Sequence, residues 1–253
     1  MKPILAVLAS ALIASGCGGA VGGETADRGH SYIVGIDISG SRTKAELDES
    51  KQLLDALINR LEAGDHLTLI EVYQGGREPA RQWSANIRAP RNPGKLTASD
   101  RRRVEDFKSI ARMQSAILFD SVRAKEILST DIVGTLYRAA DYAKASRNRG
   151  TTLLLLSDMI NETPDVRMVN QHDIPRDAWI QRLASAKRIP QLHGICVVVV
   201  GADVSSARGA AIRHFWDEYF RAAGTSVQPD NYRNMISDPA EVSCPGQATG
   251  GGG

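Results

Sequence analysis

The sequence predicts a three-layer α/β fold, in which a doubly wound, mostly parallel sheet has helices on both faces and one antiparallel edge strand. Short apolar runs alternate with amphipathic stretches along the chain, which is typical of strands and helices that follow one another in a parallel sheet. The runs at 152–156 and 192–200 are apolar on both faces, as central strands are when helices cover both sides of a sheet. A length of 253 residues, with 42% hydrophobic and 24% charged residues, suits one globular domain with a sizeable core.

The first half of the domain alternates strands with two amphipathic helices. Between 43 and 61, leucine and isoleucine recur on one helical face, and Gly64 follows as a stop signal. From 83 to 87 apolar and polar residues alternate, which indicates an edge strand packed on one side only. Ser99 is the expected amino cap of a long helix. The expected elements are a strand at 32–36, a helix at 43–61, a strand at 67–73, an edge strand at 83–87 and a helix at 98–128.

The second half continues the alternation. The last expected helix, at 207–222, carries much of the aromatic content of the chain. Beyond 224 the sequence becomes polar and contains several prolines, so we expect one further short strand near Ser226 and then a disordered tip. The expected elements are a helix at 132–146, a strand at 152–156, a helix at 178–188, a strand at 192–200 and a helix at 207–222.

The first residues are typical of an export signal. Lys2 precedes a run of small and apolar residues that is too short to span a bilayer and ends in Ala14-Ser15-Gly16-Cys17. These four residues resemble the lipobox of bacterial lipoproteins, which implies cleavage before Cys17 and attachment of lipid to its sulfur. Ala14 departs from the leucine that the family prefers, so ordinary cleavage near Gly16 without lipid stays open as an alternative.

The same resemblance implies a location in the bacterial cell envelope. Gly18, directly after the lipidated cysteine, favours the outer membrane, with the domain in the periplasm or at the cell surface. The small and polar residues that follow suit a flexible tether between lipid and domain. The expected segments are a signal peptide at 1–16, a lipid-anchored tether at 17–29, the domain at 30–224 and a C-terminal extension at 225–253.

Charge and cysteine usage argue against several classes of function. Lysine and arginine total 31 against 29 acidic residues, a formal charge of +2, which gives no electrostatic reason to expect nucleic acid as a partner. The cysteines and histidines are not spaced as zinc ligands are. In an oxidising compartment Cys196 and Cys244 are able to pair, but Cys196 lies within an apolar run, so we expect an unbridged core residue.

Three short motifs place oxygen ligands at one edge of the predicted sheet. The strand at 32–36 ends in an aspartate followed by two serines at alternate positions, a threonine precedes the helix at 132–146, and a second aspartate follows the strand at 152–156. Ligands of open α/β sheets bind beyond the carboxyl ends of the strands, so these side chains are expected to meet there. Two carboxylates and three hydroxyls are hard oxygen donors, which suit Mg²⁺ or Mn²⁺. The residues are Asp37, Ser39, Ser41, Thr130 and Asp158.

This set of residues, in this order, resembles the metal-ion-dependent adhesion site (MIDAS) of von Willebrand factor A (vWA) domains, over about 31–223. The resemblance implies a Rossmann-like vWA sheet and a bound cation that accepts an acidic side chain, aspartate or glutamate, from a protein partner. Ser157-Asp158-Met159 stands where Thr-Asp-Gly is common, a departure expected to alter the turn but not the ligand. The implied role is adhesion or scaffolding by a cell-envelope lipoprotein that its lipid holds to the membrane.

Residues beside the predicted site are candidates for partner contact. Arg42 directly follows the serines, where it would meet an acidic ligand or cap its own helix. The loop after Asp158 should rim the metal face, although a solvated surface loop would have the same composition. The candidates are Arg42, Asn161, His172 and Asp173.

Two other interpretations of the motifs stay open. One is a vWA-like scaffold without a functional metal site. The other comes from residues 35–43, which also resemble the first phosphate loop of actin-like and Hsp70-like ATPases, although the second, glycine-containing phosphate loop of that fold has no counterpart at 157–161. The chain contains no Gly-x-Ser-x-Gly, His-Glu-x-x-His or Walker motif, so we do not expect an enzyme.

Overall fold

The structure is a computed structural model that describes residues 29–73, 80–92, 94–119, 129–146, 150–236 and 238–241. The expected signal peptide, Cys17, the tether up to residue 28 and the C-terminal tip lie outside these ranges. Within them, no helix combines the length and the apolar character needed to cross a membrane.

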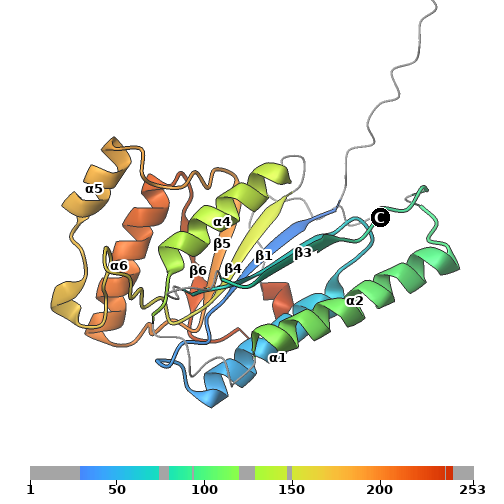
Figure 1. Cartoon of the computed structure of the whole chain (residues 1–253), viewed down its shortest axis with the longest axis horizontal. Coiled ribbons are helices and arrows are strands. Elements are labelled where there is room, and N and C mark those ends of the chain that lie inside the picture. The colour runs from blue at the N-terminus through green and yellow to red at the C-terminus, as the bar shows by residue number, and fades with distance from the viewer. Residues whose placement is uncertain are drawn as a thin grey trace, which may run out of the picture.

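Six strands form one sheet in the order β3-β2-β1-β4-β5-β6 (Figure 1). All neighbouring strands are parallel except β2 and β3, so the edge strand predicted from the alternation at 83–87 is antiparallel, as expected. The strands are β1 (Ser31–Ile36), β2 (His66–Glu71), β3 (Gln82–Asn86), β4 (Thr151–Leu156), β5 (Ile195–Val200) and β6 (Val227–Arg233).

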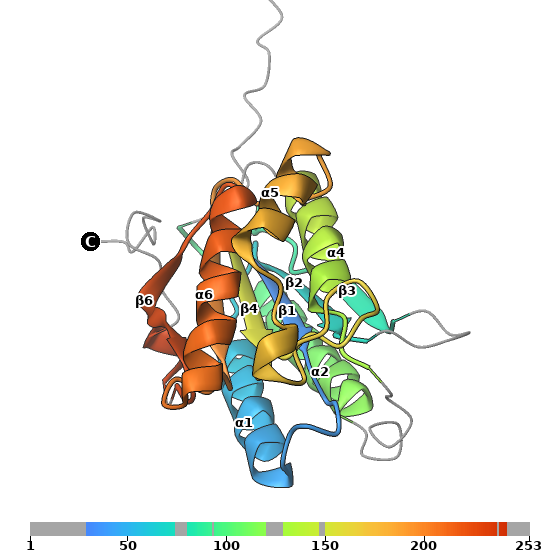
Figure 2. The ribbon, with the colours of Figure 1, turned by 90° about the vertical axis from the view of Figure 1, so that its left-hand side faces the viewer.

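Helices cover both faces of this sheet, which confirms the predicted fold class. Figure 1 shows α1 and α2 below the sheet and α4 above it, and Figure 2 shows α4, α5 and α6 together in the upper part of the view. The α-helices are α1 (Lys44–Arg60), α2 (Ala98–Leu118), α4 (Ile132–Ala145), α5 (Asp177–Ser185) and α6 (Ala207–Ala222). Two short 3-10 helices, η1 (Gln171–Asp173) and η2 (Pro239–Glu241), complete the described elements.

The two faces have separate hydrophobic cores, because successive side chains of a strand point to opposite sides. In β5, Val197 and Val199 belong to the core under α4, α5 and α6, where the aromatic side chains of α6 are buried. Val198 and Val200 belong to the core under α1 and α2. This division explains why the central strands are apolar at every position.

Several element boundaries differ from those expected: α2 ends at Leu118 and not at 128, α5 ends at Ser185 and not at 188, and β5 begins at Ile195 and not at 192. The long helix α2 is capped by Thr97 rather than Ser99, because Asp100 completes a capping box: its amide donates to Thr97 Oγ1 (3.1 Å) and its carboxylate accepts from the Thr97 amide (2.8 Å). At the other end of the chain, β6 pairs with β5 in the same sheet. The short strand expected near Ser226 is therefore β6, and the sheet continues beyond residue 224.

Cys196 is disulfide-bonded, and the expectation of an unbridged thiol in β5 is wrong. The other cysteines of the chain, Cys17 and Cys244, both lie outside the described residues. An apolar run shows that a cysteine is buried, but a sulfur in a core contacts a second sulfur only if the tertiary structure brings one there.

The strand order sets the place of a site. The chain builds β1, β2 and β3 outward in one direction and β4, β5 and β6 in the other, so the order reverses between β1 and β4. Ligands of such sheets bind beyond the carboxyl ends of the strands at this switch point. The two strands are in register, with Ile36 opposite Leu156, so the residues that follow them come out side by side.

Candidate metal centre

Asp37 is the first residue after β1 and is completely buried. Its amide continues the ladder to β4, donating to the carbonyl of Leu156 at 3.0 Å. Its Oδ1 accepts from the amide of Ser39 at 3.0 Å, which bends the chain into the turn before α1. The last residues of a buried strand thus fix both the position and the direction of this carboxylate.

The two serines of the motif share one side of that turn. Ser39 Oγ and Ser41 Oγ lie 2.9 Å apart, the first buried and the second exposed. Ser41 also hydrogen-bonds the carboxylate of Asp158. Alternate spacing therefore directs both hydroxyls to one point, and Ser41 joins the loop after β1 to the loop after β4.

Ser157 is a member of the site that the sequence analysis did not select. Its hydroxyl donates to Asp37 Oδ2 at 2.7 Å and accepts from the amide of Met159 at 2.9 Å. The signal for it lies in the strand register, because a residue directly after Leu156 must lie beside the residue directly after Ile36. Ser157 positions the first aspartate from the neighbouring strand.

Asp158 carries a carboxylate whose charge has little compensation. Burial and, second to it, the nearby charge of Asp37 together raise its pKa from the ordinary 3.8 to about 6. Hydrogen bonds from the Ile160 amide and the Ser41 hydroxyl and the charge of Arg42 oppose that rise. Two carboxylates held together at low exposure favour either a proton or a cation between them.

Thr130 contributes a hydroxyl without a partner. The residue is completely buried, and its Oγ1 makes no hydrogen bond within the described part of the chain. Its carbonyl accepts from the Glu162 amide at 2.8 Å, which fixes this loop against the segment after β4. A buried hydroxyl left without a partner costs about 1–3 kcal/mol, so an oxygen in this state is suited to accept a ligand.

Asn161 is buried and structural, although we expected it at the partner surface. Its Oδ1 accepts from the amides of Ile132 (2.8 Å) and Val133 (3.3 Å), and its Nδ2 donates to Thr163 Oγ1 (3.0 Å) and the Val166 carbonyl (2.7 Å). With its amide group fully used, Asn161 holds the first turn of α4, and the Thr130 loop before it, against the loop that follows β4.

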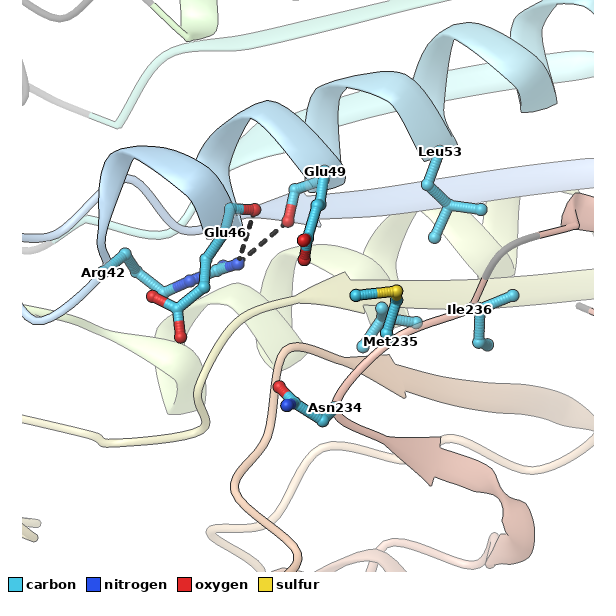
Figure 3. A pocket seen from close by; sticks show the side chains of 9 residues that line it. Arg42, Glu46, Glu49, Leu53, Asn234, Met235 and Ile236 are labelled. Atoms are coloured by element: carbon cyan, nitrogen blue, oxygen red, sulfur yellow. Dashed lines mark hydrogen bonds between the residues drawn. The ribbon is translucent and has the colours of Figure 1, made fainter.

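Arg42 also has a structural role in place of the expected partner contact. Only 7% of the residue is exposed, and its guanidinium donates to the carbonyls of Leu156 (3.0 Å), Asp37 (3.4 Å) and Glu46 (3.1 Å) and to Ser50 Oγ (2.9 Å). Figure 3 shows the guanidinium turned toward α1. Arg42 therefore ties β1, β4 and α1 together beneath the site and is not available to an acidic partner.

The remaining two partner candidates lie in η1. His172 is exposed, and its imidazole Nε2 lies 3.2 Å from the carboxylate of Asp173. Asp173 also accepts from Asn170 Nδ2 at 2.9 Å. These described contacts are local to the loop, so the structure joins Asp37, Ser39, Ser41 and Asp158 directly and does not join His172 or Asp173 to them.

Met159 follows the second aspartate in a left-handed conformation, with φ 64°. Such a backbone favours glycine, because a side chain there costs roughly 1–2 kcal/mol. Here the methionine is completely buried, and its carbonyl accepts from Trp216 Nε1 at 2.9 Å. The departure from glycine changes what packs beneath the turn, while the turn itself remains left-handed.

A third acidic side chain lies near the pair. Glu162 is half-buried; burial raises its pKa, and the charge of Asp37 raises it further, while Arg167 and Arg208 oppose the shift. The described residues contain no group of three or more histidine, cysteine, aspartate or glutamate side chains arranged for a metal ion. The candidate centre instead combines two carboxylates with hydroxyls, the donor set of a hard cation.

Comparisons with known proteins give no family. No protein-family model matches the chain. No curated protein matches it either.

Several solved structures resemble this chain in fold, with low sequence identity. Proximal thread matrix protein 1 from the mussel byssus is 12% identical, with a TM-score of 0.44 over 85% of this chain and 46% of that one. An aerotolerance-related membrane protein from Bacteroides fragilis is 14% identical, with a TM-score of 0.44 over 84% of this chain and 95% of that one. The manganese-loaded Plasmodium vivax TRAP protein is 12% identical, with a TM-score of 0.40 over 85% and 70%. The chain thus spans about half of the first of these proteins, and likenesses this weak carry no conclusion about function.

Proposed function

We propose that Asp37, Ser39, Ser41, Thr130 and Asp158 hold a magnesium or manganese ion and that this site captures an acidic side chain of a protein partner. The protein would act as an adhesion or scaffold component of a bacterial cell envelope, anchored through lipid on Cys17. The role is binding without catalysis.

The observation that carries the proposal is the Thr130 hydroxyl. It is buried and unpartnered within the described residues, in a loop that the Glu162 amide ties to the segment after Asp158. Folded proteins rarely leave such an oxygen without a partner, and a bound cation would supply one.

The charges at the site support the same proposal. Burial and the charge of Asp37 together hold the pKa of Asp158 near 6, so the protein spends free energy to keep two carboxylates close. A divalent ion would stabilise both ionised forms, and hydroxyl ligands add no negative charge to neutralise it. The two carboxylates balance the charge of the ion formally, and with only neutral hydroxyls as further ligands the ion would still attract a carboxylate from outside.

The cation is tested by titration calorimetry of Mg²⁺ and of Mn²⁺ into the purified chain. Asp37→Asn keeps the size of the side chain and removes its charge, so saturable binding in the wild type should be lost or weakened by about tenfold or more. Thr130→Val removes one hydroxyl and leaves both charges, with Thr130→Ser as the matched control that restores a hydroxyl. Equal heats in all four proteins would contradict the assigned ligands.

Partner capture is tested separately, on envelope extract passed over the immobilised protein. Proteins retained in Mg²⁺ should be released by a chelator and should not bind Asp37→Asn. Retention that survives the chelator and the substitution would favour the alternative, a scaffold whose interactions use another face.

A further inference from the structure

We propose that a pocket beside the candidate metal centre is a second binding site, one that receives the cationic end of an amine or guanidinium ligand. The pocket has a volume of about 330 Å³ and lies between the first turns of α4, the loop at 163–166, and α5 with the turn after it. We call it the aromatic pocket. The residues lining it that bear on the choice of ligand are Asp131, Tyr137, Asp165, Trp179 and Arg188. It does not depend on the proposed cation.

Two aromatic side chains form its walls. Trp179 on α5 is half-buried and packs against Phe215 in the core, with ring centroids 6.0 Å apart. Tyr137 on α4 is 41% exposed, which is unusual for so large an apolar ring on a helix that packs against the sheet. The faces of tryptophan and tyrosine attract organic cations, and an aromatic ring held in place by a core loses little freedom on binding.

The carboxylates at the pocket give it negative charge. Asp131 caps α4, its Oδ1 accepting from the Gly134 amide at 2.7 Å, and no described hydrogen bond or ion pair uses Oδ2. Asp165 is exposed, and its carboxylate likewise has no hydrogen bond or ion pair among the described contacts. Arg188 is the opposing charge, so these three side chains sum to one negative charge.

The combination selects a cation over an anion or a purely apolar group. An anion would meet two carboxylates against one guanidinium, and an apolar group would leave Asp131 Oδ2 without a partner. An alkylammonium or guanidinium group offers hydrogen-bond donors to the carboxylates and charge to the aromatic faces. Two sources share this chemistry, a free amine and a lysine or arginine side chain of a protein.

The experiment follows the indole N–H signals of the full-length chain by NMR, in chelator, so that the candidate metal centre takes no part. Trp179→Phe identifies the signal of that residue. The probes are capped lysine, capped arginine and n-butylammonium, with capped norleucine as a neutral control of similar length. We expect the Trp179 signal to shift saturably with at least one cationic probe and not with norleucine.

The variants have matched chemistry. Asp131→Asn keeps an equally good helix cap and removes the charge, and Asp165→Asn alters an exposed position, so both should fold and each should weaken binding by about tenfold. Arg188→Gln should strengthen it. Tighter binding of a capped amino acid than of butylammonium indicates a protein side chain, and tighter binding of butylammonium indicates a free amine; either supports the site. Three outcomes would overturn the proposal: shifts with norleucine equal to those with the cations, unchanged affinity in both aspartate variants, or no saturable shift with any cation.

Discussion

Replacing Thr130 by valine should raise the stability of the protein without cation and reduce its stabilisation by Mg²⁺, if Thr130 is a ligand as proposed. Valine is also β-branched and occupies nearly the same space, so the change removes little more than the hydroxyl. The Thr130 carbonyl keeps its hydrogen bond from the Glu162 amide, because only the side chain changes. The substitution therefore tests a buried oxygen that lacks a hydrogen-bond partner within the described residues.

Without cation the variant should be more stable than the wild type. An unpartnered buried hydroxyl costs about 1–3 kcal/mol, and a methyl group in its place has no such cost. For a chain of this size, 1 kcal/mol shifts the melting temperature by about 2–4 °C, so Thr130→Val should melt about 2–12 °C higher in chelator.

Adding the cation should stabilise the wild type more than the variant. At a Mg²⁺ concentration of about 100 times Kd, the wild type should gain about 2.7 kcal/mol, and the variant, which lacks one ligand, should gain less. The control Thr130→Ser keeps the hydroxyl and loses a methyl group, so it should lose about 1 kcal/mol in both conditions and keep the Mg²⁺ gain.

The assay is urea unfolding of the three proteins, each in chelator and in Mg²⁺. Lower stability of Thr130→Val in chelator would mean that the hydroxyl is bonded within the fold, which refutes the reasoning from its burial. An undiminished Mg²⁺ gain in Thr130→Val would remove Thr130 from the ligands.

Three further predictions concern neighbouring residues. The folded pKa of Asp158, about 6, is above its ordinary 3.8, so the unfolded chain releases this proton first. In chelator, urea unfolding should therefore show the free energy of unfolding falling by roughly 2 kcal/mol from pH 4 to pH 6. Mg²⁺ or Asp158→Asn should flatten that profile, and a flat wild-type profile in chelator would contradict the uncompensated pair. Met159→Gly relieves the left-handed backbone by roughly 1–2 kcal/mol but removes a buried side chain worth roughly 2–5 kcal/mol. Denaturant unfolding should therefore show a net loss of about 0–4 kcal/mol, and a gain would mean that the backbone strain dominates. Arg42→Met should lower the free energy of unfolding by on the order of 3 kcal/mol, because it removes a buried cation that is hydrogen-bonded to four groups. A variant that is as stable as the wild type but no longer binds the partner would instead support the partner contact first expected of Arg42.

Periodicity was sufficient for the elements and for the edge of the sheet at which the site lies. The expected helix at 207–222 coincides with α6, the run at 152–156 covers β4 except for its first residue, and the run at 192–200 contains β5. Helix caps were less predictable, because Ser99 and Thr97 are both good caps and only the partner at the third helical position, Asp100, decides between them.

The candidate site was predictable only in part. Asp37 and Asp158 follow strands that the sequence marks as buried, and parallel strands deliver such residues to one edge. Ser157 escaped notice because its role depends on the register of β1 against β4, two strands more than a hundred residues apart in the chain. The disulfide of Cys196 escaped for a similar reason, since pairing depends on which segments meet.

By itself the sequence determined the α/β class, the edge of the sheet and the oxygen-rich donor set, because strand burial, helix periodicity and ligand type are properties of short segments. The tertiary structure alone decided which polar side chains remain available for binding. Arg42 and Asn161 follow the site motifs and look like surface residues in sequence, yet both are buried with their polar groups bonded to other segments. Thr130 has the opposite outcome, a buried hydroxyl that makes no hydrogen bond with any described residue. Whether a polar atom has a partner depends on which distant segments pack against it, and no local pattern records that.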